Sequence, residues 1–268
     1  MNILIIGKPI KQLTDVIRSS ELLGKLYTAT DEPINELPNI EYYSLDNLVQ
    51  KTKALQVDVA INLDKDLINK FLVEVFSANR LNIISVNQKW LNLETSRFAA
   101  KKLMEYYSVN TAPLIKAPKD FPVVLNTDID NKSEIVNTFD ELVSKMEKYD
   151  GKRPYIEEYL DGETFDMLCM WDGKNIYYFN SPKTMTEVQE DRLYLIRTKL
   201  NFMFSDEKAD FSGIFNIKLI WAKNDWYVRD FEMGIPDSAN LGEILTESGR
   251  DFLYILNSAI YQKLNEMV

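Results

Sequence analysis

Two acidic side chains lie two positions apart in the sequence YVRDFEMG, residues 227–234. The flanking residues predict a β-strand, and because successive side chains of a strand alternate between its faces, Asp230 and Glu232 would share one face. Two carboxylates on one face can hold a hard cation such as Mg²⁺, with Mn²⁺ as the alternative. The competing interpretation is the exposed face of an edge strand, where acidic side chains prevent aggregation.

The composition restricts the chemistry of such a site. The 268 residues include no histidine, one cysteine and nine glycines, and the formal net charge is −10. The absence of histidine removes His-activated nucleophiles and most zinc or iron sites. The acidic balance excludes an ordinary nucleic-acid surface. No two glycines are spaced as in a dinucleotide-binding or Walker loop, so a phosphate site would need another kind of cradle.

Residues 1–90 alternate between predicted strands and predicted helices. The expected strands are residues 2–7, 25–30, 40–45, 57–63 and 82–87, and the expected helices are 15–25 (closed by Gly24), 45–56 and 64–80. This alternation predicts an α/β domain whose parallel sheet is covered on both faces.

Residues 91–268 have a different pattern, which predicts an α+β domain with a mainly antiparallel sheet. Helices are expected at 95–107 with Ser96 as the cap, at 138–152 with a Thr138–Glu141 capping box, and at about 240–266. The expected strands are 121–126, 154–160, 164–173, 175–180, 213–224 and 226–233. The sequences WDGKN and AKNDW between four of these strands indicate hairpin turns.

Four segments in this order resemble motifs of the ATP-grasp ligases, most closely those of phosphoribosylamine–glycine ligase. They are SRFAAKKLMEYYSVNTAP (96–113), FPVVLNTD (121–128), YIEEYLDGE (155–163) and VRDFEMGIPD (228–237). The resemblance covers about residues 57–260. It implies a Rossmann-like pre-ATP-grasp domain over 1–90 and an ATP-grasp domain with a nucleotide and metal cleft over 91–268. It also implies joining of a small-molecule carboxylate to an amine through an acyl phosphate, with ATP and Mg²⁺ as cofactors.

The resemblance also assigns binding roles to individual residues. It places the adenine hinge at Glu157, Glu158, Tyr159 and Leu160, the ribose contact at Glu163, the phosphate contact at Arg97, and the metal ligands at Asp230 and Glu232. It assigns no catalytic residue.

The chain also departs from the family pattern. Asn126 replaces the strand lysine, TDIDNKSEIV (127–136) replaces the glycine-rich lid, and GKPIKQL (7–13) replaces the loop that holds the substrate phosphate. The basic residue after strand 226–233 is replaced, and we expect the family's C-terminal domain to be absent. These losses favour an alternative, a non-catalytic relative that binds a nucleotide or metabolite as a scaffold module. Cations above the acidic pair, from Arg97, Lys116, Lys119 or Lys183, would instead favour the ligase.

The remaining signals have structural alternatives. Lys8 and Lys11 could hold an anion at a helix start or lie in a solvated turn. Lys116 and Lys119 could replace the strand lysine or lie on the surface, and Cys169 is expected in the core. No secretory leader or membrane-length apolar run is present, which predicts a cytoplasmic protein without membrane contact. A homodimer is compatible with the sequence.

Overall fold

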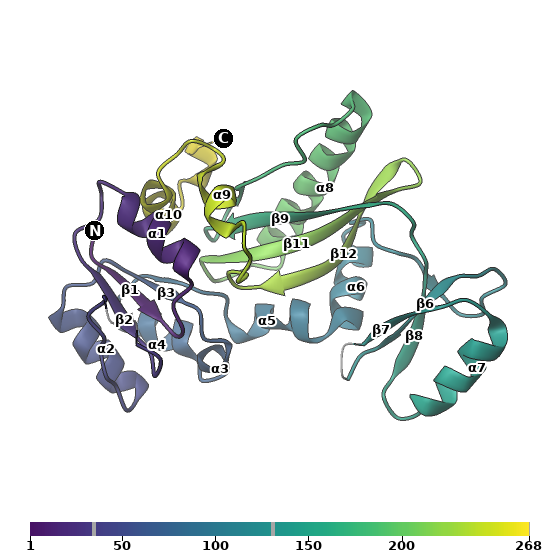
Figure 1. Cartoon of the computed structure of the whole chain (residues 1–268), viewed down its shortest axis with the longest axis horizontal. Coiled ribbons are helices and arrows are strands. Elements are labelled where there is room, and N and C mark those ends of the chain that lie inside the picture. Colours follow the sequence, from purple (N-terminus) through teal and green to yellow (C-terminus); the bar gives the residue numbers. More distant parts are fainter. Residues whose placement is uncertain (34–35, 130–131, 268) are drawn as a thin grey trace.

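A computed structural model describes residues 1–33, 36–129 and 132–267. Three four-stranded sheets follow one another along the long axis of the molecule (Figure 1). The N-terminal sheet occupies one end, a long antiparallel sheet the middle, and a small antiparallel sheet the other end. The parallel sheet and the two antiparallel sheets agree with the predicted α/β and α+β halves.

The N-terminal sheet is parallel, in the order β2-β1-β3-β4. Its strands are β1 (Ile3–Ile6), β2 (Leu26–Ala29), β3 (Val59–Asn62) and β4 (Ile83–Ile84). The helices in this part are α1 (Lys11–Ser19), α2 (Leu45–Ala54), α3 (Lys65–Ile68) and α4 (Leu72–Ala78). Ile3 and Ile5 join the core beneath α1, whereas Leu4 and Ile6 join the core beneath α2 and α4. Both faces are therefore buried, as the continuous apolar run predicts.

Three predictions for this region were wrong. Helix α1 ends at Ser19, before Gly24, because Gly24 approaches the start of the chain and a Cβ there would lie 2.7 Å from Asn2 Oδ1. Residues 40–45 form no strand, and Tyr43 is 87% exposed. The helix expected over 64–80 is two helices, because the chain turns at Phe71 with φ at +61° and the Phe71 N–H bonds back to the carbonyl of Ile68.

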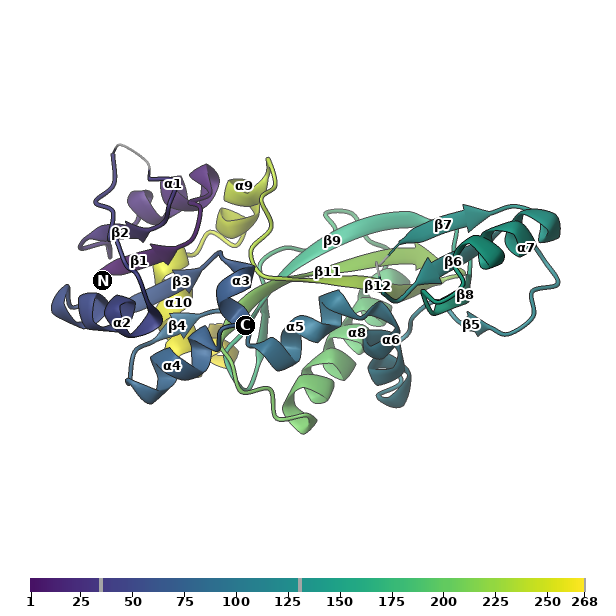
Figure 2. The same cartoon turned by 90° about the horizontal axis from the view of Figure 1, so that it is seen from below.

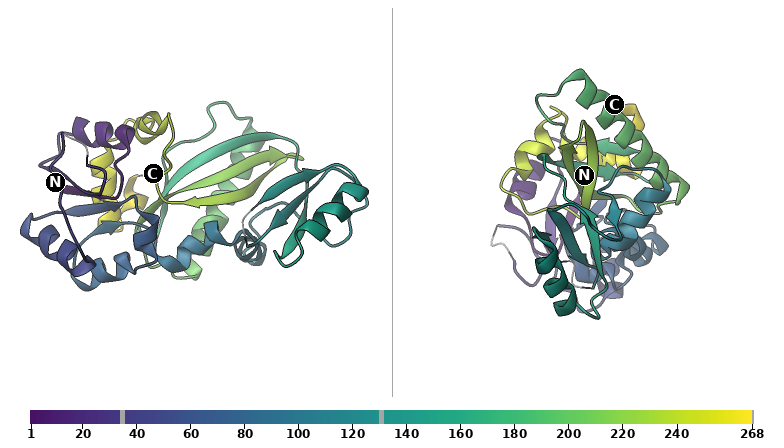
Figure 3. Two further views of the ribbon diagram at one scale, coloured as in Figure 1. Left: turned by 60° about the horizontal axis from the view of Figure 1, so that its bottom comes forward. Right: turned by 90° about the vertical axis from the view of Figure 1, so that its right-hand side faces the viewer.

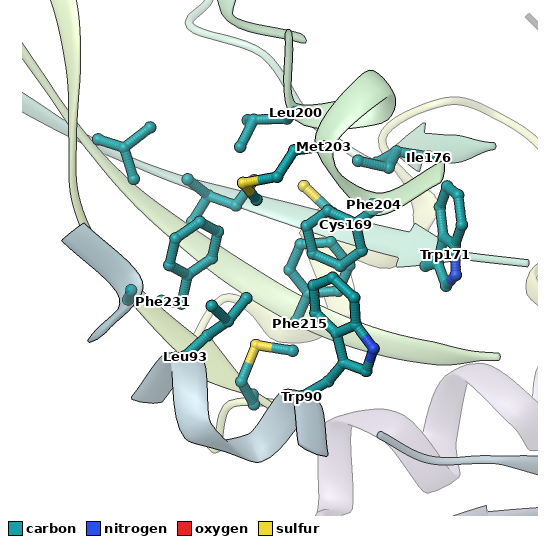
Figure 4. Close-up of a cluster of buried hydrophobic side chains, with 14 of the residues drawn as sticks. Trp90, Leu93, Cys169, Trp171, Ile176, Leu200, Met203, Phe204, Phe215 and Phe231 are labelled. Atoms are coloured by element: carbon teal, nitrogen blue, oxygen red, sulfur yellow. The ribbon is translucent and has the colours of Figure 1, made fainter. Parts of the chain in front are cut away.

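The central sheet is antiparallel, in the order β10-β9-β11-β12. Its strands are β9 (Glu163–Trp171), β10 (Ile176–Tyr178), β11 (Gly213–Ala222) and β12 (Asp225–Met233), joined by the two predicted hairpins. One face packs on α5 (Gln88–Thr95), α6 (Arg97–Tyr106) and α8 (Glu187–Asp206). Figure 4 shows this core, which includes Trp90 of α5 and Phe204 of α8. The two rings are stacked, and their centroids lie 4.6 Å apart.

Helix α8 was not predicted, although it spans 20 residues. Thr186 and Gln189 form a capping box at its start, and Leu193, Ile196 and Leu200 follow at helical spacing on its buried side. The pattern is masked by further apolar residues on the outer side of the helix. Helix α5 was also missed.

The small sheet has the order β5-β8-β6-β7 and is antiparallel. Its strands are β5 (Leu114–Ile115), β6 (Val123–Thr127), β7 (Ser133–Val136) and β8 (Pro154–Glu158), and α7 (Phe139–Lys148) covers one face. Strands β5 and β7 were not predicted. The segment 127–136, expected to replace the lid, forms the β6–β7 hairpin, and its residues 130–131 lie outside the described chain.

The chain returns to the N-terminal sheet at its end, as the yellow helices in Figure 2 and Figure 3 show. The single helix expected over 240–266 is wrong. It is divided into α9 (Leu241–Thr246), α10 (Phe252–Ile260) and a 3₁₀ helix, η1 (Leu264–Met267). The break includes Gly249, whose φ is +68°. Helices α9 and α10 share a core with β1 and α1. The boundary at residue 90 stays a prediction.

None of the helices in the described part of the chain is both long and apolar enough to cross a membrane.

Candidate functional site

A cleft of about 690 Å³ lies between the central sheet and the small sheet, with α6 at its side. It occupies the face of the central sheet opposite α8, because Asp166 and Lys218 line it while their strand neighbours Met167 and Ile217 lie in the core beneath that helix. Its volume suits a small-molecule ligand. Of the predicted site residues, Arg97, the hinge 157–160 and Asp230 line this cleft.

Strand β12 carries Asp230 and Glu232 on one face, as predicted. Phe231 and Met233 are buried between and after them, whereas both acids are only partly buried. A β-bulge interrupts the pairing with β11, since Lys218 lies opposite Asp230 and Leu219 opposite Val228. The bulge places the unpaired Arg229 beside Asp230 on the cleft.

Arg97 joins the two walls of the cleft through a chain of polar contacts. Its Nη2 lies 2.7 Å from Asp230 Oδ2 on the central sheet, and its Nη1 donates to Ser133 Oγ at 2.8 Å on the small sheet. Ser133 Oγ in turn donates to Asn126 Oδ1. Burial raises the pKa of Asp230, and the positive charge of Arg97 opposes that shift. Arg97 therefore holds the carboxylate that the resemblance assigns to a metal.

Asn126 presents a buried donor to the cleft. Its side chain is 3% exposed, and its Oδ1 accepts the bond from Ser133, which leaves Nδ2 without a hydrogen-bond partner among the described residues. The amide lies close enough to Glu157 to favour the ionised carboxylate, although the geometry is not that of a hydrogen bond. An unpaired buried donor costs about 1–3 kcal/mol. A ligand oxygen in the cleft would remove this penalty.

The hinge is anchored by a buried ion pair that was not predicted. Lys101 Nζ lies 3.0 Å from Glu157 Oε1, and the two side chains are 4% and 16% exposed. The same ammonium donates to Thr111 Oγ1 at 2.9 Å and to the carbonyl of Ala112. Burial lowers the pKa of Lys101 and raises the pKa of Glu157, and in each case the charge of the partner opposes the shift. The pair fixes the helix α6 to the first residue of the hinge.

The other predicted ligand residues differ in their surroundings. Glu158 pairs with Lys223 at the edge of the cleft, and Glu232 lies 3.6 Å from Lys218. Glu163 is exposed at the start of β9 and does not line the cleft, whereas Thr164 and Asp166 do.

Alternation along β9 explains the position of Glu163, which shares a side with the core residue Met167. Its predicted ribose contact stays a prediction. Lys116, Lys119 and Lys183 do not line the cleft either.

Three cations of the cleft were missed: Lys101, Lys218 and Arg229. Lys101 had a signal, because it lies four residues after Arg97 and so shares its side of the helix. Lys218 and Arg229 depend on the β11–β12 register and its bulge, which the sequence does not specify. Of the four cations expected above the acidic pair, Arg97 alone lines the described cleft, and Lys218 and Arg229 lie beside Asp230 instead.

The N-terminal loop forms a separate crevice of about 480 Å³ at the carboxyl ends of β1, β2 and β3. Lys8 there pairs with Glu32 at 2.8 Å, and Lys11 pairs with Asp15 on its own helix. Asp31, Glu32, Asp64 and Asp66 make the crevice predominantly acidic. Lys8 and Lys11 thus have carboxylate partners, and Cys169 is fully buried, as predicted.

The donor set of the cleft fits a nucleotide with Mg²⁺. Mg²⁺ is commonly held by one or two carboxylates together with substrate phosphates. Asp230 lines the cleft and would suffice, whereas Glu232 shares its face of β12 but does not line the cleft. Within residues 1–33, 36–129 and 132–267 no group of three or more acidic or Cys side chains could hold a metal without such a ligand. The unpaired Nδ2 of Asn126 and the nearby guanidinium groups suit phosphate oxygens.

The chain is similar in sequence to known ligases. No protein-family model matches the chain. The phosphoribosylamine–glycine ligase of Fusobacterium nucleatum is 24% identical over 320 aligned positions, which take in 100% of this chain and 75% of that protein.

Solved structures give the fold. Phosphoribosylamine–glycine ligase from Thermotoga maritima matches with a TM-score of 0.72 and 14% identity, over 97% of this chain and 75% of that one. D-alanine–D-alanine ligase from Bacillus anthracis complexed with ATP matches with a TM-score of 0.60 and 16% identity, over 99% of this chain and 98% of that one. The chain therefore has the fold of the ATP-grasp ligases and, as its four motifs predict, is similar among them to phosphoribosylamine–glycine ligase.

Proposed function

We propose that this chain binds ATP in the cleft between the central and small sheets and acts as a carboxylate–amine ligase of the ATP-grasp type. The observation that carries the proposal is the buried Nδ2 of Asn126, which has no partner in the described chain and lies where the family has its phosphate-binding lysine. The similarity to phosphoribosylamine–glycine ligase and the ATP bound to a protein of the same fold support it.

The two walls of the cleft would divide the binding of the nucleotide. The hinge 157–160 borders the end of the cleft next to Lys101 and would receive the base. Asn126 is linked through Ser133 and Arg97 to Asp230, and Arg229 lies at the bulge next to Asp230, so these residues would contact phosphate oxygens. Charge-assisted hydrogen bonds from guanidinium groups to phosphate are strong and directional.

Nucleotide binding would exchange one ion pair for two. Arg97 and Asp230 hold each other at 2.7 Å, and both are partly exposed to the cleft. A phosphate would attract Arg97, and Mg²⁺ would be held by Asp230 with Glu232. The metal, when bound, would offset the negative charge that moves onto the leaving phosphate oxygens. No net charge would be left unpaired in this exchange.

The proposed reaction has two steps. A carboxylate oxygen attacks the terminal phosphorus of ATP, which forms an acyl phosphate and releases ADP. The amine then attacks the acyl carbon, and inorganic phosphate leaves with the electrons of the broken C–O bond while the nitrogen loses a proton. The cations around the cleft, Arg97, Lys218 and Arg229, would stabilise the negative charge of the phosphate groups.

The geometry does not favour a sugar phosphate as the second substrate. The N-terminal crevice, at the end of the parallel strands, is lined by four acids and two lysines, and Lys8 and Lys65 are already paired with Glu32 and Glu94. Such a surface repels a phosphate and attracts an amine. We therefore expect an amine substrate without a phosphate group.

The test is ADP release in the presence of ATP, Mg²⁺ and a panel of carboxylates and amines. We expect release that depends on a carboxylate and is lost in the Asp230→Asn/Glu232→Gln double variant. Asp225→Asn, on the same strand but outside the cleft, is the matched control and should keep the activity.

A second candidate is a nucleotide-binding module without catalysis. It is favoured by Asn126 in place of the strand lysine, since the amide supplies a hydrogen bond but no charge. ATP binding without any carboxylate-dependent ADP release across the panel would support this alternative over the ligase.

A further inference from the structure

Helix α8 has an apolar side that faces solvent. Its inner side is buried in the core, where Figure 4 shows Leu200, Met203 and Phe204. On the outer side, Val188, Leu195 and Phe202 are 55%, 46% and 58% exposed. These three residues, called here the outer stripe, lie outside the buried core and do not line the cleft.

The outer stripe is continuous along the helix. Its residues are spaced by seven, close to two full turns, so they lie on one side of the helix one above the other. At the Phe202 end the apolar surface continues onto α6, where the ring of Tyr107 lies 5.8 Å from Phe202 and 4.9 Å from Tyr106. Tyr106 is 78% exposed. A row of exposed apolar side chains of this extent marks an interaction surface.

The charges beside the stripe identify its partner. Asp191 and Lys199 lie four residues before and four residues after Leu195. Neither forms an ion pair or a side-chain hydrogen bond with the rest of the described chain. If a second α8 lies antiparallel with a two-fold axis at Leu195, Val188 faces Phe202 and Asp191 faces Lys199. The apolar residues then face apolar residues and the opposite charges face each other, as an isologous dimer requires.

We propose that two copies of this chain form a symmetric dimer through antiparallel α8 helices centred on Leu195. Val188 of each copy packs against Phe202 and Tyr106 of the second copy, and Asp191 pairs with Lys199 at two equivalent positions. One helix pair buries less surface than a standard permanent interface, so the dimer dissociates on dilution. Because α8 covers the face of the central sheet opposite the cleft, both clefts stay open in the dimer.

Sedimentation velocity over a concentration series tests the dimer. The wild-type chain should pass from monomer to dimer as its concentration rises, and Leu195→Glu should remain monomeric with an unchanged circular dichroism spectrum. Val143→Glu is the matched control, because Val143 is a similarly exposed apolar residue (43%) on the helix α7, and it should dimerise as the wild type does.

Charge reversal and cross-linking test the proposed symmetry. Asp191→Lys should weaken the dimer at least tenfold, and Asp191→Lys/Lys199→Asp should restore it. Leu195→Cys should form an intermolecular disulfide on oxidation, since residue 195 lies on the axis and the native Cys169 is fully buried, whereas Val143→Cys should not. A wild-type chain that stays monomeric at every concentration, or a dimer that Leu195→Glu leaves intact, would overturn the proposal.

Discussion

Two ion pairs of the cleft, Lys101–Glu157 at the hinge and Arg97–Asp230 at strand β12, differ in the burial of their cations. At the hinge, Lys101 and Glu157 are 4% and 16% exposed, and Lys101 also holds Thr111 and the carbonyl of Ala112. At strand β12, Arg97 and Asp230 are 32% and 17% exposed, and Lys218 and Glu232 are 42% and 34% exposed. The Lys101–Glu157 pair is thus fixed by its surroundings. We expect the Arg97–Asp230 and Lys218–Glu232 pairs to exchange partners with a ligand.

The largest expected effect is on the free energy of unfolding, when the Lys101–Glu157 pair is broken. Lys101→Met should lower the free energy of unfolding by about 3–5 kcal/mol, because it leaves Glu157 buried without a partner. Arg97→Met should lower it by only about 1–2 kcal/mol, because the replaced guanidinium is itself 32% exposed and the charge of Lys218 still favours the Asp230 carboxylate. Urea unfolding of the two variants measures the difference.

A double variant separates the charge from the packing. Lys101→Met/Glu157→Gln should recover most of the stability that Lys101→Met loses, because no unpaired charge is left in the interior. Equal losses in the Lys101 and Arg97 variants would remove the distinction between the two pairs.

The effect of Mg²⁺ on ATP affinity should depend on Asp230 and Glu232 and not on the Lys101–Glu157 pair. In the Asp230→Asn/Glu232→Gln variant, we expect ATP affinity with Mg²⁺ to fall at least tenfold, or about 1.4 kcal/mol, to the affinity measured without the metal. Titrations with and without Mg²⁺ measure this. Retained Mg²⁺ enhancement in the variant would show that these acids do not hold the metal.

A cation in place of Asn126 should strengthen the binding of phosphate in the cleft. Asn126→Lys restores the charge of the family lysine and should raise ATP affinity about tenfold, which corresponds to about 1.4 kcal/mol. Asn137→Lys adds the same charge at an exposed position outside the cleft and should change the affinity little. Equal gains from both would indicate non-specific attraction.

The smallest effect concerns pH. Burial raises the pKa of Asp230 above its ordinary 3.8, so the native state takes up a proton at a higher pH than the unfolded chain does. The unfolding free energy of the wild type, relative to Asp230→Asn, should therefore rise as the pH falls from the raised pKa to about 3.8, and then level off. A pH-independent difference between the two proteins across this range would contradict the burial of Asp230.

The sequence predicted the parts of the fold and site that depend on local pattern. Asp230 and Glu232 share a face because strand alternation requires it, and Ser96 caps α6 through the N–H of Ala99. Arg97 was expected at the phosphate end and lines the cleft.

What the sequence did not predict depends on register or on two-sided burial. The β-bulge that exposes Arg229 and the pairing that places Lys218 opposite Asp230 are properties of two strands together. The spacing from Arg97 gives the side of the helix on which Lys101 lies, but its burial depends on the contact of α6 with Glu157 of β8. Helix α8 was missed because its outer stripe adds apolar residues where a helix usually presents polar ones.

Calorimetric titration of the wild-type chain with ATP and Mg²⁺ tests the central claim most directly. We expect saturable heat at submillimolar nucleotide, which the Asp230→Asn/Glu232→Gln variant reduces at least tenfold and Asp225→Asn leaves unchanged. Absence of binding at millimolar ATP with Mg²⁺, or equal binding by the double variant, would contradict the assignment of the cleft to a magnesium nucleotide.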